Sequence, residues 1–235
     1  MKLTDIFLAL EAGELSTQTS LIDTVTGVKP ENYNKVISHI NLGLTNLYER
    51  FNIRTGDVWV MMLEGVAEYT LDYKHAFTNL ASTELKYIVD SPYDIFGNDV
   101  IRILEATTEI GEPLPINDRT KEKSIFTPSQ NTIQIPWKVG GDAINVVYRA
   151  AHRQIRLADY NDITEIEVEL PASYLEPLLY FVAYRHFAGI GGQSATPTSL
   201  GYFQKYDARC NQILLNGVPN IDQSVSTDFF NNGWA

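Results

Sequence analysis

The sequence predicts an α+β protein in which the N- and C-terminal segments form one helical bundle and the middle of the chain is a β-rich insertion. Apolar residues recur every three or four positions near the N-terminus and again after residue 171, which is the pattern of amphipathic helices. Between these regions, short β-branched and aromatic runs are separated by Gly, Pro, Asn and Asp, which is typical of strands and turns. Each class of element must bury its apolar face, so the helices are expected to pack on one another and the strands to form a separate part. The predicted boundaries are 1–56 and 171–217 for the two helical parts, 57–170 for the β-rich insertion and 218–235 for an extended C-terminal arm.

Two helices are predicted in the N-terminal part. The apolar positions of the first are Leu3, Ile6, Phe7 and Leu10, and Thr4 and Asp5 can cap its first turn. Residues 12–29 have no sustained period and predict a loop, after which Pro30 suits the first turn of a longer helix. The apolar positions of this longer helix are Tyr33, Val36, Ile37, Ile40, Leu44, Leu47 and Phe51. Gly56-Asp57 is expected to end it.

Strands are predicted throughout the insertion. The candidates are 58–63, 68–71, 100–105, 124–127, 132–135, 142–149 and 163–170. The last alternates Ile166, Val168 and Leu170 with three glutamates, so it predicts a strand with one buried face and one acidic face.

The chain is predicted to become helical again after Pro171. One helix is expected to end at the glycines of 189–192, and a final helix to run from about Leu200 to Leu215, closed by Asn216-Gly217. We expect the long N-terminal helix to pack against these later helices. The residues assigned to this core and to packing within a ring are Ile37, Ile40, Leu44, Leu47, Leu178, Leu179 and Val182.

The composition excludes several classes of protein. The 235 residues are 44% hydrophobic, which is enough for a buried core, and no window approaches the roughly 20 apolar residues of a membrane span. The N-terminus has no basic region and no cleavage site of a signal peptide, so a cytoplasmic origin is expected. Cys210 is the single cysteine, so no disulfide can form within one chain. The net charge of −11 disfavours general binding of nucleic acid; it would let DNA slide through a conduit, although solubility alone accounts for most acidic proteins.

The residues that could carry chemistry do not form a recognisable site. His39, His75, His152 and His186 stand apart in the sequence without metal-ligand spacing, and core-edge positions are expected for His39 and His186. Gly189–Gly192 lacks the lysine and hydroxyl residue of a phosphate loop, no serine has a Gly-x-Ser-x-Gly context, and Cys210 lies on an apolar helix face. The glutamates of the last strand could cleave a glycosidic bond only if their face lined a cleft, and like charges on an outer face are the commoner use; they are Glu165, Glu167 and Glu169. No catalytic residue, cofactor or metal is predicted, and the chain is expected not to be an enzyme.

The C-terminal arm is aromatic at its end. Phe229, Phe230 and Trp234 stand in an otherwise polar segment where they cannot bury one another locally. Docking on a partner is one reading. An arm folded back on its own subunit, or disorder, is the other.

Three stretches of the sequence resemble one protein family. They are the helical run Val36-Ile-Ser-His-Ile-Asn-Leu-Gly-Leu-Thr-Asn-Leu-Tyr-Glu-Arg50, the middle segment from Val100 to Ala150, and Leu170-Pro-Ala-Ser-Tyr174 with the helix to His186. Within the middle segment the likeness rests on Val100-Ile-Arg-Ile-Leu104, Gly111-Glu-Pro-Leu-Pro-Ile-Asn117, Ser124-Ile-Phe-Thr-Pro128, Ile133-Gln-Ile-Pro136 and Val146-Val-Tyr-Arg-Ala150. In order and arrangement they resemble the head-to-tail adaptors of short-tailed bacteriophages, the tail tubular protein A group. The likeness covers most of the chain but contains no catalytic signature.

This resemblance implies a structural role in the virion. Such adaptors form a homo-oligomeric ring, usually dodecameric, between the portal protein and the tail nozzle, and the ring continues the channel for double-stranded DNA. The C-terminal arm of the family often anchors to the portal, which would give Phe229, Phe230 and Trp234 a docking role. Some relatives are linked to peptidoglycan hydrolysis, but no matching acid pair can be assigned here.

Three other readings of the sequence stay open. The chain could be another neck or tail component, such as a stopper or nozzle subunit. It could be a cell-wall hydrolase that uses Glu165, Glu167 and Glu169, or a module that binds polysaccharide through exposed Trp and Tyr side chains of the β part.

Overall fold

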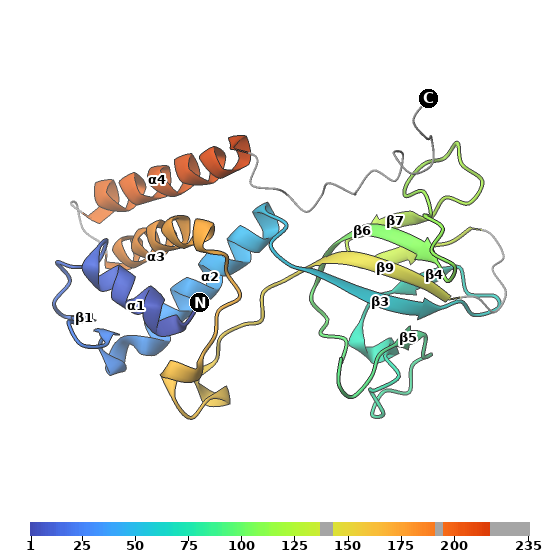
Figure 1. Ribbon diagram of the computed structural model, residues 1–235, viewed down its shortest axis with the longest axis horizontal. Helices are drawn as coiled ribbons and strands as arrows, with labels where there is room; N and C mark the ends of the chain where they lie inside the picture. The colour runs from blue at the N-terminus through green and yellow to red at the C-terminus, as the bar shows by residue number, and fades with distance from the viewer. Residues whose placement is uncertain (137–142, 191–194, 217–235) are drawn as a thin grey trace. The chain divides into compact units, whose positions relative to one another are not determined.

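The chain folds into two compact units, in agreement with the predicted α+β class. The computed structural model describes residues 1–136, 143–190 and 195–216. The helical unit consists of Met1–Ile53 and His152–Ala235, and the β unit is Arg54–Ala151, so the β unit is inserted between two halves of the helical one (Figure 1). No helix in the described part of the chain is long and apolar enough to cross a membrane.

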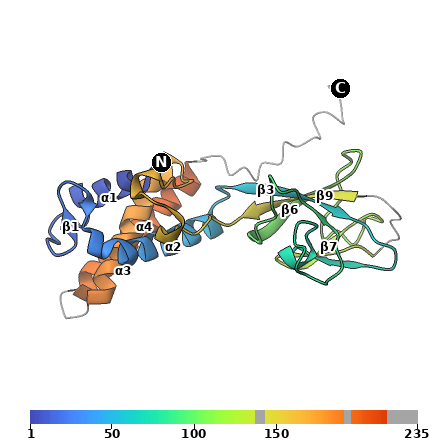
Figure 2. The same cartoon turned by 90° about the horizontal axis from the view of Figure 1, so that it is seen from below.

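In the residues that the structure describes, the helical unit contains four α-helices and several short elements. They are α1 (Leu3–Ala12), β1 (Ile22–Asp23), β2 (Gly27–Val28), η1 (Pro30–Asn32), α2 (Tyr33–Arg50), η3 (Leu157–Asp159), η4 (Ile163–Glu165), η5 (Ala172–Tyr174), α3 (Leu175–Ile190) and α4 (Ala195–Leu215). The predicted helices are therefore present. Helices α3 and α4 lie side by side in both views (Figure 1 and Figure 2).

Helix α2 packs against α3 within this unit. Its predicted apolar stripe is buried except for Tyr33, which is half-buried. Gly43 in the same face allows close approach of α3, because a Cβ there would lie 2.6 Å from Leu178 Cδ1. The helix ends at Arg50, not at Gly56-Asp57 as predicted. The reason is that Gly56 and Asp57 belong to a strand paired with Tyr148 and Val147, and this pairing overrides their turn propensity.

Aromatic pairs join α3 to α4. Ring centroids are 5.3 Å apart for Phe181 and Tyr206, and 5.2 Å for Tyr184 and Phe203. Helix α4 begins at Ala195, earlier than the predicted Leu200, because a proline within the first turn is compatible with a helix. The two helices thus form a hairpin held by stacked and edge-on rings.

The predicted loop 12–29 contains a small hairpin, β1–β2. Gly27 has φ +79 and its α-carbon lies so close to α1 that a Cβ would be 2.4 Å from the Phe7 carbonyl carbon. Only glycine fits there without displacing α1. Val28 is fully buried next to this contact.

The predicted strand 163–170 does not form. Its residues fold as η4 followed by extended chain with one isolated bridge, between Lys2 and Glu167. The predicted alternation holds, since Ile166, Val168 and Leu170 are buried and the glutamates are exposed. The buried side chains belong to the helical unit, where the Leu3 amide donates to the Ile166 carbonyl at 2.9 Å. The compact β unit therefore ends at Ala151, whereas the predicted insertion runs to residue 170.

The β unit has two antiparallel sheets that share one core. The four-stranded sheet has the order β5 (Ile88–Val89), β3 (Thr55–Met61), β9 (Ala143–Ala150) and β6 (Val100–Thr108). The three-stranded sheet has the order β4 (Glu68–Thr70), β8 (Thr132–Gln134) and β7 (Phe126–Ser129). Val58, Val60 and Val146 of the first sheet and Tyr69 and Ile133 of the second lie in the same buried cluster. Six of the predicted strands are present, and β5 was missed because it is only two residues long.

Candidate assembly surface

The predicted packing residues lie in the core of the helical unit. Ile37, Ile40, Leu44, Leu47, Leu178, Leu179 and Val182 are all buried. Their side chains therefore stabilise the fold of the chain itself. The predicted docking residues Phe229, Phe230 and Trp234 lie outside the described residues.

The structure brings together two histidines that are far apart in the sequence. His39 of α2 and His186 of α3 interact electrostatically, and burial is the main cause that lowers the pKa of each, for His186 to about 4. His75 stacks on Tyr87 in the β unit, with centroids 4.5 Å apart. Among the described residues, no group of three or more His, Cys, Asp or Glu could hold a metal ion.

The other chemical candidates occupy ordinary structural positions. Glu165, at the end of η4, and Glu167 and Glu169, in the extended segment that follows, are exposed, whereas Ile166, Val168 and Leu170 are buried. Cys210 is fully buried on α4, and burial raises the pKa of its thiol, which makes it a poor nucleophile. Helix α3 continues through Gly189 and ends at Ile190, close to the predicted stop.

A surface that the sequence did not predict lies on the long connection from β4 to β6. We call residues 72–98 the apolar loop, because it exposes several large apolar side chains, with Leu80 93% and Tyr93 101% exposed. The full set is Phe77, Leu80, Leu85, Val89, Tyr93 and Ile95. So many exposed apolar groups in one segment are typical of an interaction site.

Polar contacts hold the apolar loop in a defined conformation. The Lys86 ammonium donates to the carbonyls of Lys74 and Asn79 at 2.9 and 2.7 Å. The Asp90 carboxylate accepts from the amides of Thr78 and Phe96 at 2.9 and 3.2 Å, and also from the Thr78 hydroxyl. These bonds cross-link the loop internally, so its apolar side chains are presented without a large entropic cost of ordering on binding.

Buried aromatic residues anchor the apolar loop to the core of the β unit. Tyr87 and Phe96 are buried, and the Tyr87 hydroxyl donates to the Thr70 carbonyl at 2.9 Å. Burial raises the pKa of Tyr87 to about 12, so its hydroxyl stays a donor at physiological pH. The alternation of buried anchors and exposed apolar side chains gives the loop an inner and an outer face.

The outer face of the adjoining sheet extends this apolar surface. In β3, Val58 and Val60 point into the core while Trp59 and Met61 are partly exposed. Trp59 pairs with Val89 of β5 in the register of the sheet, so its side chain neighbours the apolar loop.

The apolar loop carries a negative charge. It contains Asp72, Glu84, Asp90 and Asp94 against Lys74 and Lys86, which is four minus two, or a net −2. The ammonium of Lys86 is directed to carbonyls of the loop itself. A protein partner with apolar pockets and a basic rim would complement this surface.

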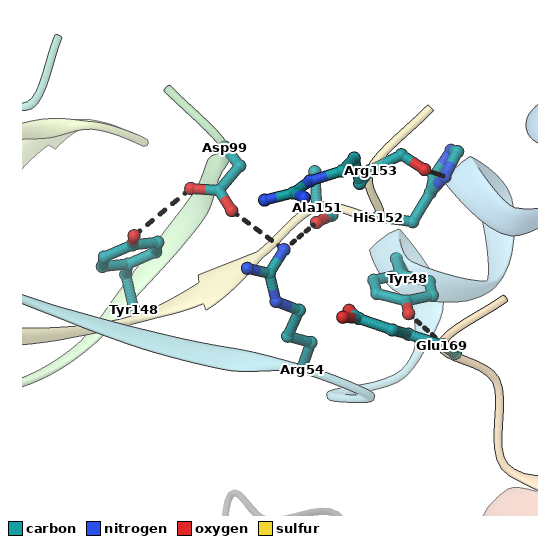
Figure 3. A network of polar contacts seen from close by, with 8 residues as sticks. All are labelled: Tyr48, Arg54, Asp99, Tyr148, Ala151, His152, Arg153 and Glu169. Atoms are coloured by element: carbon teal, nitrogen blue, oxygen red, sulfur yellow. Dashed lines mark hydrogen bonds and ion pairs between the residues drawn. The ribbon is translucent and has the colours of Figure 1, made fainter. Parts of the chain in front are cut away.

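A polar network joins the first and last residues of the β unit (Figure 3). Arg54, its first residue, forms an ion pair with Asp99 at 3.1 Å and donates to the carbonyl of Ala151, its last residue, at 3.1 Å. The Tyr148 hydroxyl donates to the other oxygen of Asp99 at 3.2 Å, and Asp99 together with burial raises the pKa of Tyr148. The ends of the insertion are thus tied to each other and to β6.

A second network in Figure 3 belongs to the helical unit. His152 Nδ1 donates to the Arg153 carbonyl at 3.1 Å, His152 Nε2 lies 3.0 Å from the Thr45 hydroxyl, and the Tyr48 hydroxyl donates to the Glu169 carbonyl. Burial lowers the pKa of His152, so the ring is neutral at physiological pH. This network fixes the returning chain on α2.

The sequence offered one signal for the apolar loop. Phe77, Leu80, Leu85 and Tyr93 stand in a turn-rich stretch where they match neither a helical nor a strand period. Such residues have no regular element through which to bury themselves, but only the structure separates them from the anchors Tyr87 and Phe96.

Comparison with family models and with curated proteins does not assign the chain to a family. No family model matches the chain, and no curated protein matches it.

Proposed function

We propose that this chain is a structural head-to-tail adaptor of a tailed bacteriophage. In this proposal, copies of the chain form a ring that joins the portal protein to the tail nozzle and continues the DNA channel. The chain is a component of the neck of the virion and has no catalytic role. The resemblance of three sequence stretches to the tail tubular protein A group supports the proposal.

The observation that carries the proposal is the ordered apolar loop. Leu80 and Tyr93 are almost wholly exposed although the surrounding backbone is cross-linked by Lys86 and Asp90. A monomeric protein gains nothing from an exposed apolar surface of this kind, whereas an assembling subunit buries it against a partner.

A second apolar surface on the helical unit is consistent with a ring. Leu200, Phe203, Leu214 and Leu215 of α4 are exposed. Identical subunits in a closed ring contact one another head to tail, so each subunit needs two different complementary surfaces. The apolar loop and the exposed side of α4 supply one on each unit.

The charge of the chain suits a DNA conduit. With a net charge of −11, the chain repels a DNA backbone over much of its surface, so DNA would pass through the channel without binding to a specific sequence.

The test uses a double variant of the apolar loop, Leu80→Ser/Tyr93→Ser. The full chain is mixed with the purified portal protein of the same phage, and complexes are separated by sedimentation. Exposed side chains contribute little to the fold, so we expect an unchanged melting temperature. Apolar anchors at interfaces contribute a few kcal/mol each, so we expect the variant to need at least about tenfold more protein for the same assembly.

The matched control is Val25→Ser/Ile110→Ser. These side chains are 82% and 80% exposed and lie outside the apolar loop, so this variant should assemble like the wild type. Equal assembly of the loop variant and the wild type would remove the apolar loop from the interface. A wild-type chain that never joins the portal would remove the adaptor function and favour another neck or tail component.

A further inference from the structure

Two histidines, His39 of α2, which is half-buried, and His186 of α3, which is buried, interact electrostatically where α2 packs on α3. His186 is 5% exposed, and both ring nitrogens of His186 and of His39 are buried without a hydrogen-bond partner among the described residues. About one turn further along α2, a Cβ on Gly43 would lie 2.6 Å from Leu178 Cδ1, so the two helices approach closely at that point. A buried polar ring that has no partner is unusual, because it loses its hydrogen bonds to water and gains none.

The charged groups around the two rings are all basic. Lys35 of α2 acts on both rings, Arg185 of α3 acts on His39, and His39 acts on His186; each of these interactions lowers a pKa. No carboxylate of α1, α4 or any other described element is among the groups that act on either ring.

The single carboxylate of α3 and the single carboxylate of α4 both pair with arginines. Asp207 of α4 pairs with Arg50 at 2.8 Å, and Glu176 of α3 pairs with Arg209 at 2.7 Å. Protonation of the two histidines would therefore place two further positive charges in a buried site that contains no described counter-ion.

We propose that the His39–His186 pair makes the packing of α2 on α3 sensitive to acid. While both rings are neutral, the two helices stay packed. When the pH falls, protons bind preferentially to the open form, in which the rings are solvated and separated from Lys35 and Arg185. The packing of α2 on α3 in the helical unit is thus labile to acid, whereas the packing within the β unit is not.

The direction of the effect follows from linkage. Solvated histidine has a pKa of 6.5, and in the packed form the pKa of His186 is about 4 and that of His39 is also lowered. Between these values the open form binds more protons than the packed form, so packing loses stability as the pH falls from 6.5 towards 4. Above 6.5 both forms are neutral and packing is independent of these rings.

Hydrogen exchange followed by mass spectrometry tests the proposal on the full chain. At about pH 5, compared with about pH 7.5, peptides from α2 and α3 should lose protection on the order of tenfold after correction for the intrinsic exchange rate. Peptides from β3 and β9 should keep theirs. The variant His39→Gln/His186→Phe has no group at either position that can be protonated in this pH range. Its α2 and α3 peptides should therefore be equally protected at both pH values.

The control variant is His75→Gln, which removes a histidine from the β unit and should behave like the wild type. Equal protection of α2 and α3 at both pH values in the wild type, or the same acid loss in the double variant, would overturn the proposal. If the double variant does not fold, NMR titration of the wild-type rings decides. Midpoints of His39 and His186 below 6.5 support the proposal, and midpoints at or above 6.5 overturn it.

Discussion

At the scale of single residues, the helical core is specified by side chains that the sequence pattern identifies directly. Leu44 and Leu47 are buried in α2, whereas Leu42 of the same helix is 45% exposed. Hydrophobicity does not separate these leucines, but their positions in the helical period do. The period was therefore sufficient to assign the buried face.

The substitution Leu44→Asp is expected to prevent folding of the helical unit. It places an unpaired carboxylate in the core, which costs several kcal/mol, comparable with the whole stability of a small domain. Circular dichroism and thermal melting measure the effect. Leu42→Asp is the control on the same helix and should fold and melt nearly like the wild type. A Leu44→Asp chain that is soluble and melts cooperatively would show that Leu44 is not in the core.

The residues that form the histidine pair could not be found in this way. His39 and His186 are 147 positions apart in the chain (186 minus 39), and each taken alone fits the predicted edge of a helical stripe. Their meeting depends on how α2 packs against α3, which includes the close approach at Gly43. Helical periodicity gives the face of each helix but not the register between two helices.

At the scale of elements, the sequence pattern found most strands and misplaced one. The alternation of Ile166, Val168 and Leu170 with glutamates is real, but alternation needs only an extended chain with one buried side. Whether such a chain joins a sheet depends on a partner strand elsewhere, and here the partners are the amide of Leu3 and the carbonyl of Met1. The boundary at Ala151 could not be predicted for the same reason.

The element-scale prediction concerns Arg54, which ties the ends of the β unit together. Arg54→Ala removes the ion pair with Asp99 and the bond to the Ala151 carbonyl, so we expect a loss of about 1–2 kcal/mol in the free energy of unfolding. Urea unfolding followed by tryptophan fluorescence, to which Trp59 of β3 contributes, measures it. Arg102→Ala, an exposed arginine of β6, is the control; equal stability of the two variants would mean that the network does not hold the ends.

At the scale of the whole molecule, the α+β class and the insertion of a β unit within a helical one were predicted from the sequence. The exposed surface of the apolar loop was not predicted. Its exposed and its buried apolar residues are of the same kind in the sequence, and only the fold determines which of them are buried. The proposed assembly surface is therefore the part of this protein for which the structure adds most to the sequence.

The C-terminal arm provides a prediction for the whole chain. Deleting residues 219–235 should leave the melting temperature unchanged, because the last described helix, α4, ends at Leu215. Stable portal binding should be lost, since an aromatic anchor repeated around a ring contributes through many copies. Co-sedimentation of the truncated and full-length chains with portal measures this. Undiminished binding would exclude a docking role for the arm, and unfolding would place the arm in the core.

Electron microscopy of the wild-type chain mixed with the portal protein that the adaptor proposal gives it as a partner tests the central claim most directly. The adaptor proposal predicts portal rings that carry an additional ring of this chain on one end, with a channel continuous through both. Portal rings that remain bare in the presence of excess folded chain would contradict the proposal.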